Sequence, residues 1–304
     1  MIKSPLHLLS AWSTWFRYPT PWSSRLRAII YYCWFISIGL FFTSQGIPPL
    51  IIAFKAYGVM ASITIFVYAL NDTMDADLDK FSSIKSKRPI PSGRLTKRQA
   101  LLLSAVGGIA GFVLSLTINF WTTIFVLIFM GLGFSYSVPP MRFKRRFLLK
   151  ETTLSAGVIV SVLVGSAALG RIPSSLFLPG LFFAIGGMTI YPVLYDPLDI
   201  KEDRREGCRT IASILSQKRR LELSTFGLLV ITITTTLTYG YFDFNIICPI
   251  LTVFACLLFL RYIFPLLLKP EETYNEEVMV KTNSICRTFG FITTLGFIIG
   301  SLQL

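Results

Sequence analysis

The chain has 304 residues, of which 53% are hydrophobic and only 15% are charged, and its mean hydropathy is +0.63. Soluble domains carry roughly 25% charged residues, so this composition excludes an ordinary soluble domain and indicates a membrane protein. The net charge of +13 would suit a nucleic-acid partner, but the Lys and Arg residues lie between long apolar runs, which excludes nucleic acid and indicates membrane topology instead.

The first 26 residues predict an interfacial segment before the first membrane crossing. They hold Trp12, Trp15, Phe16 and Trp22 together with two Arg residues, and such aromatic side chains favour the boundary between lipid and water. They lack the compact apolar stretch and the small-residue cleavage site of a secretory signal peptide. We therefore expect residues 1–26 to lie on the membrane surface.

Nine apolar runs follow, and each is long enough to cross about 30 Å of hydrocarbon as a helix. They lie near residues 27–44, 48–70, 99–117, 121–138, 154–170, 176–195, 224–242, 246–267 and 283–301. The sequence therefore predicts a single all-α domain over residues 1–304, in which nine transmembrane helices form one bundle around a central cavity.

The distribution of charge predicts the orientation of the chain in the membrane. The stretches after the second, fourth and sixth runs are rich in Lys and Arg, whereas the opposite loops hold almost none. Because positively charged loops stay in the cytoplasm, we expect the N-terminus there and the C-terminus on the opposite side. The stretches 71–98 and 196–222 also carry clustered carboxylates, which orientation does not require, so we expect them to be cytoplasmic active-site loops.

Two acidic motifs share the same spacing. The sequence after the second run reads NDTMDADLD (71–79), and the sequence after the sixth run reads DPLDIKED (196–203). Both contain D-x-x-D-x-x-x-D, formed by Asp72, Asp75 and Asp79 in the first copy and by Asp196, Asp199 and Asp203 in the second. Four runs separate the copies, so helices one to four are expected to recur as helices five to eight, with a ninth helix appended.

These spacings favour a magnesium site. Intervals of three and four residues place three carboxylates on one face of a helix, where they repel one another without a ligand. Mg²⁺ binds one or two carboxylates and completes its shell with water and substrate phosphate. Two such clusters beside Lys and Arg are therefore complementary to a diphosphate carrying two Mg²⁺ ions.

Two other classes of site fit the first motif less well. A calcium loop that starts at Asp75 would need Gly where Lys80 stands and Glu where Ser86 stands. A channel or transporter would hold its charges at mid-membrane depth, whereas these carboxylates follow the ends of the apolar runs.

Three segments together resemble the UbiA superfamily of intramembrane prenyltransferases. They are NDTMDADLD with the following KRPIPSGRLT (87–96), FSYSVPPMRFKRR (134–146) and YDPLDIKEDRREGCRT (195–210). The RPIPSGR sequence looks most like the branch of chlorophyll synthases, homogentisate prenyltransferases and digeranylgeranylglyceryl phosphate synthases. Glu202 departs from the family pattern, because many members have Gly before the last aspartate, and it adds a carboxylate to the second motif.

The resemblance implies a set of site residues. The metal ligands would be Asp72, Asp75, Asp79, Asp196, Asp199 and Asp203. The catalytic residues would be Asp75, Asp79, Asp199, Asp203 and Tyr136. Contacts to the substrate diphosphate would come from Asn71, Lys87, Arg88, Lys144 and Lys150, although each of these basic residues could instead serve only to orient the chain.

The resemblance also implies a reaction. A prenyl group would pass from a prenyl diphosphate, through an allylic cation, to a lipophilic acceptor within the bilayer. A membrane terpene cyclase, which needs no acceptor, stays open as an alternative, because the acidic motifs serve the ionisation that both reactions share. Loop 80–98 is interrupted by Pro89, Pro91 and Gly93, so we expect it to fold over the cavity mouth as a cap, unless it only orients the chain.

Overall fold

The computed structural model describes residues 5–17, 24–81, 85–194, 200, 204, 207–268 and 276–302. Over this part of the chain the secondary structure is helical, without strands. The α-helices are α1 (Pro5–Arg17), α2 (Ser24–Ser44), α3 (Leu50–Asp79), α4 (Lys97–Leu116), α5 (Phe120–Ser137), α6 (Leu149–Ala168), α7 (Phe177–Thr189), α8 (Tyr191–Leu194), α10 (Ile211–Ile214), α11 (Gln217–Thr238), α12 (Ile247–Leu268) and α13 (Glu276–Gly300). The short 3-10 helices are η1 (Lys85–Lys87), η2 (Phe143–Arg145) and η3 (Ser174–Leu176).

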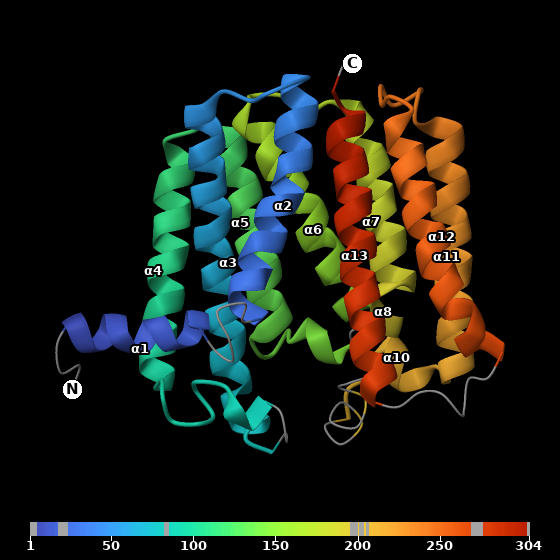
Figure 1. Ribbon diagram of the computed structural model, residues 1–304. Coiled ribbons are helices and arrows are strands. Elements are labelled where there is room, and N and C mark those ends of the chain that lie inside the picture. The colour runs from blue at the N-terminus through green and yellow to red at the C-terminus, as the bar shows by residue number, and fades with distance from the viewer. Residues whose placement is uncertain are drawn as a thin grey trace.

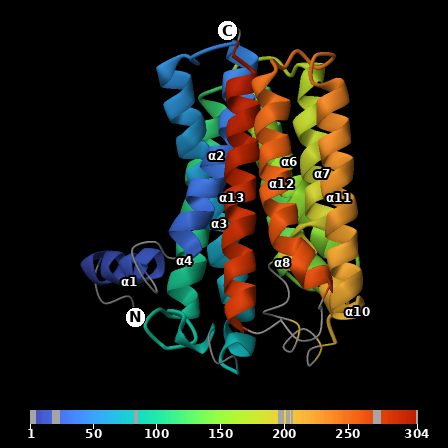
Figure 2. The same cartoon turned by 45° about the vertical axis from the view of Figure 1, so that its right-hand side comes forward.

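The long helices stand side by side in one bundle, and α1 lies across its lower end (Figure 1). Helices α2, α3, α4, α5, α6, α11 and α12 are long and apolar enough to cross a membrane. Ser174–Thr189, which includes α7, is a shorter apolar segment. The all-helical membrane bundle that the sequence predicts is therefore confirmed, whereas its count of nine crossings stays a prediction. The described chain begins at the lower end of the bundle and finishes at the upper end (Figures 1 and 2).

Several helices extend further than the apolar runs indicate, and this corrects four predicted boundaries. Residues 71–79 continue α3, residues 217–222 begin α11, Lys150 lies in the first turn of α6, and residues 24–26 begin α2. Neither Pro nor Gly occurs in these stretches, so nothing in the backbone stops the helix where the hydrocarbon layer ends. Charged helical turns thus project from the apolar part of the bundle at its lower end.

Two helices in the middle of the bundle lie between two of its apolar clusters. Side chains of α2 and α6 contribute to both clusters, one shared with α3 and α5 and the other with α7, α11, α12 and α13. Gly39 and Gly165 allow α2 and α6 to touch, since an added Cβ would lie 2.0 Å from the Val162 carbonyl oxygen or 2.3 Å from that of Ile36. This close contact lies near the last residues of α2 and α6, at the end of the bundle away from the acidic end of α3.

Candidate active site

The first acidic motif occupies the last turns of α3. A helix of 30 residues is about 45 Å long, about 15 Å more than the hydrocarbon thickness, so its end reaches beyond the apolar layer. Asn71, Asp72, Asp75 and Asp79 all lie on this end, and Asp72 and Asp79 are only 6% exposed. Buried carboxylates require partners, and Lys and Arg side chains from other elements supply them.

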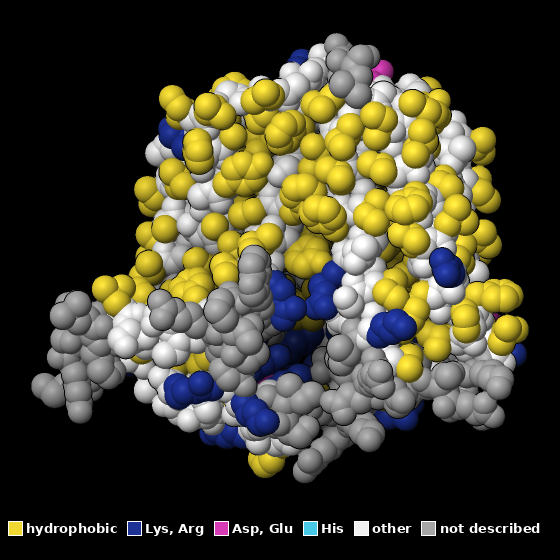
Figure 3. Space-filling model, viewed as in Figure 1, with side chains coloured by type: hydrophobic (Ala, Val, Ile, Leu, Met, Phe, Trp, Pro, Cys, Tyr) yellow, Lys and Arg dark blue, Asp and Glu magenta, His cyan; other side chains and the backbone are white. Residues whose placement is uncertain are grey.

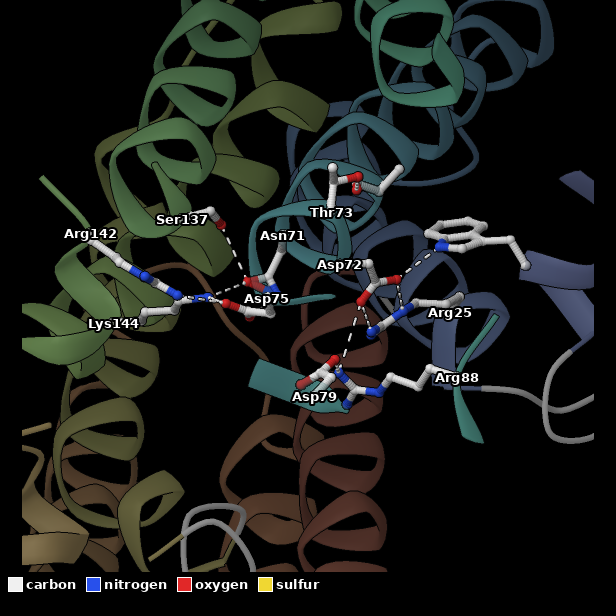
Figure 4. Close-up of polar contacts among 12 residues, drawn as sticks. Arg25, Asn71, Asp72, Thr73, Asp75, Asp79, Arg88, Ser137, Arg142 and Lys144 are labelled. Atoms are coloured by element: carbon white, nitrogen blue, oxygen red, sulfur yellow. Dashed lines mark hydrogen bonds and ion pairs between the residues drawn. The ribbon is translucent and has the colours of Figure 1, made fainter. Parts of the chain in front are cut away.

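Asp75 forms one group of contacts with the segment after α5 (Figure 4). Arg142 Nη2 donates to Asp75 Oδ1 at 3.0 Å, and Lys144 Nζ donates to the same oxygen. Lys144 Nζ also donates to Asn71 Oδ1 at 3.2 Å, and Asn71 Nδ2 donates to Asp75 Oδ2 at 3.3 Å. Asn71 Oδ1 accepts a further hydrogen bond from Ser137, the last residue of α5, at 3.3 Å. The group joins two helix ends around a carboxylate held by two cations.

A tight turn after α5 presents these two cations. The Arg142 backbone N–H donates to the Val138 carbonyl at 3.0 Å, and Arg142 itself takes a left-handed conformation with φ of 37° before η2 begins. Lys144 follows on η2 with its side chain only 13% exposed. Burial lowers the pKa of the Lys144 ammonium from its ordinary value, although the Asp75 carboxylate acts in the opposite direction. The ammonium is thus held close to the carboxylate with little water around it.

Asp72 and Asp79 form a second group, which lies on the side of α3 toward α1 and α2 (Figure 4). Arg88 Nη1 donates to Asp79 Oδ2 at 2.8 Å and lies 3.9 Å from Asp72 Oδ1. Trp15 and Arg25 also donate to Asp72. The three carboxylates that the spacing places on one helical face are therefore divided, because Asp75 faces η2 and the other two share Arg88.

The segment between α3 and α4 holds Arg88 in place. Ile90 and Leu95 are buried, and the Leu95 N–H donates to the Pro89 carbonyl at 2.9 Å. Gly93 has φ of +78°, a conformation that favours glycine, and Thr96 caps α4 through a capping box with Gln99. Lys87, by contrast, is exposed. Of the two neighbouring basic residues expected at the diphosphate, the structure brings Arg88 to the carboxylates and leaves Lys87 on the outer surface.

Lys150 and Glu151 lie side by side in the first turn of α6, and both are buried. Glu151 Oε1 accepts a hydrogen bond at 3.0 Å from the backbone N–H of Ile211, the first residue of α10. The Arg209 N–H also donates to the Arg145 carbonyl at 3.1 Å. The chain that follows the second acidic motif is thereby attached to η2 and α6. Asp196, Asp199 and Asp203 themselves lie outside the described residues.

Aromatic side chains lie along the helices above the first motif. The rings of Tyr32 and Tyr68 are 6.4 Å apart between centroids, and Phe129 packs edge-on against Tyr32 at 5.2 Å. Tyr136 lies about two turns beyond Phe129 on α5, next to the last residue of that helix. Tyr68 also carries the Arg25 guanidinium over its ring at 5.3 Å. The carboxylate groups therefore border an aromatic region that leads into the bundle.

The surface at this end of the bundle is hollowed. Figure 3 shows Lys and Arg side chains gathered in a hollow beneath the band of hydrophobic side chains that covers the upper part of the molecule. The hollow combines positive charge with immediate access to the apolar surface. Such a place suits a ligand with an anionic head and a hydrocarbon tail.

The donor set of the first motif fits a magnesium ion in part. Asn71, Asp75 and Asp79 offer oxygen donors, the type that Mg²⁺ prefers, and one or two carboxylates suffice for an ion that keeps water and phosphate in its shell. Within the described part of the chain, however, no three His, Cys, Asp or Glu side chains converge on one point. A site for two ions consequently needs donors from the second motif as well.

Two residues at the site do not stand out in the sequence. The sequence places Arg25 only in the interfacial segment, yet it bonds to Asp72. Arg142 lies within a segment that carries the family resemblance, but the contacts expected near it are Lys144 and Lys150. A basic residue next to an apolar run has two explanations, orientation of the chain and binding at a site, and its position in the sequence does not separate them.

Comparison with known proteins agrees with this architecture. A family model described as the UbiA prenyltransferase family matches residues 32–285. A digeranylgeranylglyceryl phosphate synthase from Sulfurisphaera tokodaii is 27% identical over 266 residues, which cover 81% of this chain and 86% of that protein. A lycopene elongase/hydratase from Haloarcula japonica is 26% identical over 198 residues, covering 64% of this chain and 66% of that protein.

Solved structures share the fold at lower sequence identity. A structure concerned with digeranylgeranylglyceryl phosphate synthase in membranes has a TM-score of 0.73 at 23% identity, covering 98% of this chain and 99% of that chain. A UbiA homologue from Archaeoglobus fulgidus bound to GPP and Mg²⁺ has a TM-score of 0.67 at 16% identity, covering 94% of this chain and 99% of that chain.

Proposed function

The chain belongs to the UbiA prenyltransferase family, and from this premise we propose that it transfers a prenyl group from a prenyl diphosphate to a lipophilic acceptor within the membrane. The reaction requires Mg²⁺ and proceeds by ionisation to an allylic cation. The observation that carries the proposal is the basic hollow at the end of α3, where Lys and Arg surround a carboxylate motif at the lower edge of the hydrophobic surface (Figure 3).

The proposed metal ligands are the oxygen donors of both acidic motifs. The first set is Asn71, Asp75 and Asp79; it adds Asn71 to the ligands predicted from the sequence and leaves out Asp72, whose carboxylate accepts from Trp15 and Arg25. The proposed second set is Asp196, Asp199 and Asp203, with two ions expected. Mg²⁺ bound there would stabilise the negative charge that develops on the departing diphosphate. In support, GPP and Mg²⁺ are bound in the Archaeoglobus fulgidus homologue.

The basic residues around the first motif supply the remaining positive charge. Lys144, Arg142 and Arg88 each touch a motif carboxylate, so they lie within reach of a phosphate that displaces or bridges those contacts. The C1–O bond of the substrate then breaks, and the diphosphate leaves with the bonding electrons. Lys150, buried at the start of α6, is proposed as a further contact on the side of the second motif.

The aromatic region above the motif is proposed to receive the cationic carbon. The face of Tyr136, and the face of Tyr68 that Arg25 does not cover, would stabilise an allylic cation by about 0.5–2 kcal/mol each. The hydrocarbon tail would lie between the helices, and a nucleophilic acceptor would bond to C1 and release a proton. The segment 85–96, packed against the end of α3, would keep water from capturing the cation as a prenyl alcohol.

A membrane terpene cyclase is the alternative. It uses the same ionisation, but a double bond of the substrate attacks the cation, so no acceptor is consumed. The relatives named above favour transfer, since one is named for a glyceryl phosphate product and another for lycopene elongation. These names point to different acceptors, an alcohol and a carotenoid, so we propose the acceptor only as a lipophilic nucleophile.

The proposed orientation follows from the charges. The N-terminus and the end of α3 would lie in the cytoplasm, and the C-terminus on the opposite side. In support, the described chain begins and ends at opposite ends of the bundle (Figure 1).

The decisive experiment incubates purified protein and Mg²⁺ with prenyl diphosphates of increasing chain length. Parallel samples contain geranylgeranylglyceryl phosphate, lycopene, a membrane lipid extract or no acceptor. Acceptor-dependent release of diphosphate together with a prenylated product supports the transferase. Release without acceptor and a new cyclic hydrocarbon supports the cyclase, and no Mg²⁺-dependent release with any diphosphate contradicts both.

A further inference from the structure

The hydrogen bonds to Asp72 differ from those to the other carboxylates of its motif. Trp15 Nε1 donates to Oδ2 at 2.8 Å, and Arg25 Nε donates to the same oxygen at 2.7 Å. A second nitrogen of the Arg25 guanidinium donates to Oδ1, so the pair is bidentate. Both oxygens of this buried carboxylate therefore accept hydrogen bonds from the N-terminal part of the chain.

These two donors come from elements that close one side of the site. Trp15 lies on α1 and Arg25 in the first turn of α2. Arg25 reaches Asp72 on the side away from Asp75 (Figure 4). Trp15 is only 1% exposed and belongs to an apolar cluster that includes Ala69 and Leu95. A magnesium ion usually keeps several waters in its shell, and a carboxylate enclosed by an indole and a guanidinium leaves no room for them on this side.

Asp75 has a different setting. Its partners Arg142 and Lys144 are cations on the short segment around η2, and a metal ion or a phosphate can replace such charged contacts. The Trp15 indole is neutral and fixed in a packed cluster, so no ligand charge draws it away. The two carboxylates, three residues apart on the same helix, therefore differ in their partners. A ligand can replace the partners of Asp75, but it does not displace the Trp15 indole from Asp72.

We infer that Asp72 is a positioning residue that fastens α1 and the start of α2 to the end of α3, and that it is not a metal ligand. The anchor fixes the helix that lies across the lower end of the bundle against the turn that carries Asp75 and Asp79 (Figure 2). Two contacts strengthen it: Trp12 Nε1 donates to the Gln99 carbonyl at 2.9 Å, and the Arg25 guanidinium lies over the ring of Tyr68. This inference rests on the proposed function only where turnover is measured; the exchange and metal-binding measurements do not depend on it.

The test compares Asp72→Asn with Asp75→Asn in the full-length protein in lipid nanodiscs. Hydrogen–deuterium exchange of residues 5–17 reports whether α1 stays attached. Electron paramagnetic resonance of Mn²⁺ with inorganic diphosphate, used as the probe, reports metal affinity. We expect Asp72→Asn to speed exchange in residues 5–17 by about tenfold or more, because hydrogen bonds to charged groups are stronger than neutral ones, and to leave Mn²⁺ affinity within about threefold. Asp75→Asn is expected to leave the exchange of residues 5–17 unchanged and to weaken Mn²⁺ binding by more than about threefold.

A second variant keeps the proposal testable if Asp72→Asn folds poorly. Trp15→Phe removes the indole N–H but preserves an aromatic ring and the carboxylate, so α1 should exchange faster with unchanged Mn²⁺ affinity.

In turnover assays, Asp72→Asn should lower kcat without raising the half-saturating Mg²⁺ concentration, whereas Asp75→Asn should raise that concentration. Unchanged exchange of residues 5–17 in both variants, or loss of Mn²⁺ affinity in Asp72→Asn equal to that in Asp75→Asn, would overturn the assignment. Neither the exchange nor the Mn²⁺ measurement needs turnover, so failure of prenyl transfer alone would contradict only the proposed function.

Discussion

The change Asp75→Asn tests the proposed metal site most directly, and Asp77→Asn is its matched control. Both aspartates lie on the last turns of α3, two residues apart. Asp75 is 17% exposed beside Arg142 and Lys144, whereas Asp77 is 67% exposed and pairs with the surface residues Lys80 and Lys97. Each change removes one negative charge and keeps the shape of the side chain. The comparison therefore isolates what the charge does inside the hollow.

The size of the expected effect follows from these contacts. Loss of a metal ligand removes several kcal/mol of transition-state stabilisation, which corresponds to roughly a thousandfold slower turnover. The fold should survive, because the amide oxygen of the introduced asparagine can still accept from Lys144 or Arg142. We expect the free energy of unfolding to fall by about 2 kcal/mol, since hydrogen bonds to a charged group are replaced by weaker ones to a neutral group. Asp77→Asn should leave both the turnover and the free energy of unfolding close to those of the unaltered protein, because exposed ion pairs contribute little.

The assay measures diphosphate release from a prenyl diphosphate at saturating Mg²⁺, with thermal unfolding in the same detergent as the check on folding. The expected result is slow turnover of Asp75→Asn, which still unfolds in a cooperative transition at a somewhat lower temperature, and normal turnover of Asp77→Asn. Equal activity of the two variants would refute the placement of the reacting diphosphate at the end of α3.

Four further outcomes are expected. Removal of divalent ions with EDTA should abolish turnover and Mg²⁺ should restore it; near-normal activity in EDTA would contradict a metal-dependent ionisation. Arg88→Ala should raise KM for the prenyl diphosphate by about tenfold or more, whereas Lys97→Ala, which breaks only an exposed pair, should not; equal KM values would remove Arg88 from the site. Asp199→Asn should reduce turnover as far as the corresponding change in the first motif, and a normally active variant would exclude a second metal-binding motif. Glu151→Ala should destabilise the protein by about 1–3 kcal/mol because it leaves the buried Ile211 N–H without its acceptor, while Glu151→Gln should retain most of the stability; thermal unfolding that does not distinguish the two would show that the hydrogen bond contributes nothing.

The positions of the helices could be predicted from the sequence because a span in a membrane needs a long apolar run. The run at 48–70 corresponds to α3 and the run at 121–138 to α5. The ends of the helices were predicted less accurately, because hydropathy shows where the apolar layer ends and not where the helix ends. In α3 the two differ by about two turns, and the acidic motif lies in that difference.

The candidate site could be predicted as a set of residues but not as an arrangement. The spacing of the motif predicted Asp72, Asp75 and Asp79, and the family resemblance implied Lys144 and Arg88. The division of the motif into two groups depends on which neighbour reaches each carboxylate, and these neighbours come from segments far apart in the sequence. Arg25, 47 residues before Asp72, is the clearest example, because no local pattern links the two residues.

The overhang of α3 has a consequence for what happens to the two products. The end of this helix carries the motif past the apolar layer, while the hydrophobic surface of the bundle begins immediately above it (Figure 3). In the proposed reaction, inorganic diphosphate would therefore be released directly into water, where it is diluted and hydrolysed. The prenylated lipid would diffuse sideways into the bilayer. Partition of the products between two phases would then draw the reaction forward, with no separate step needed to carry either product across the membrane.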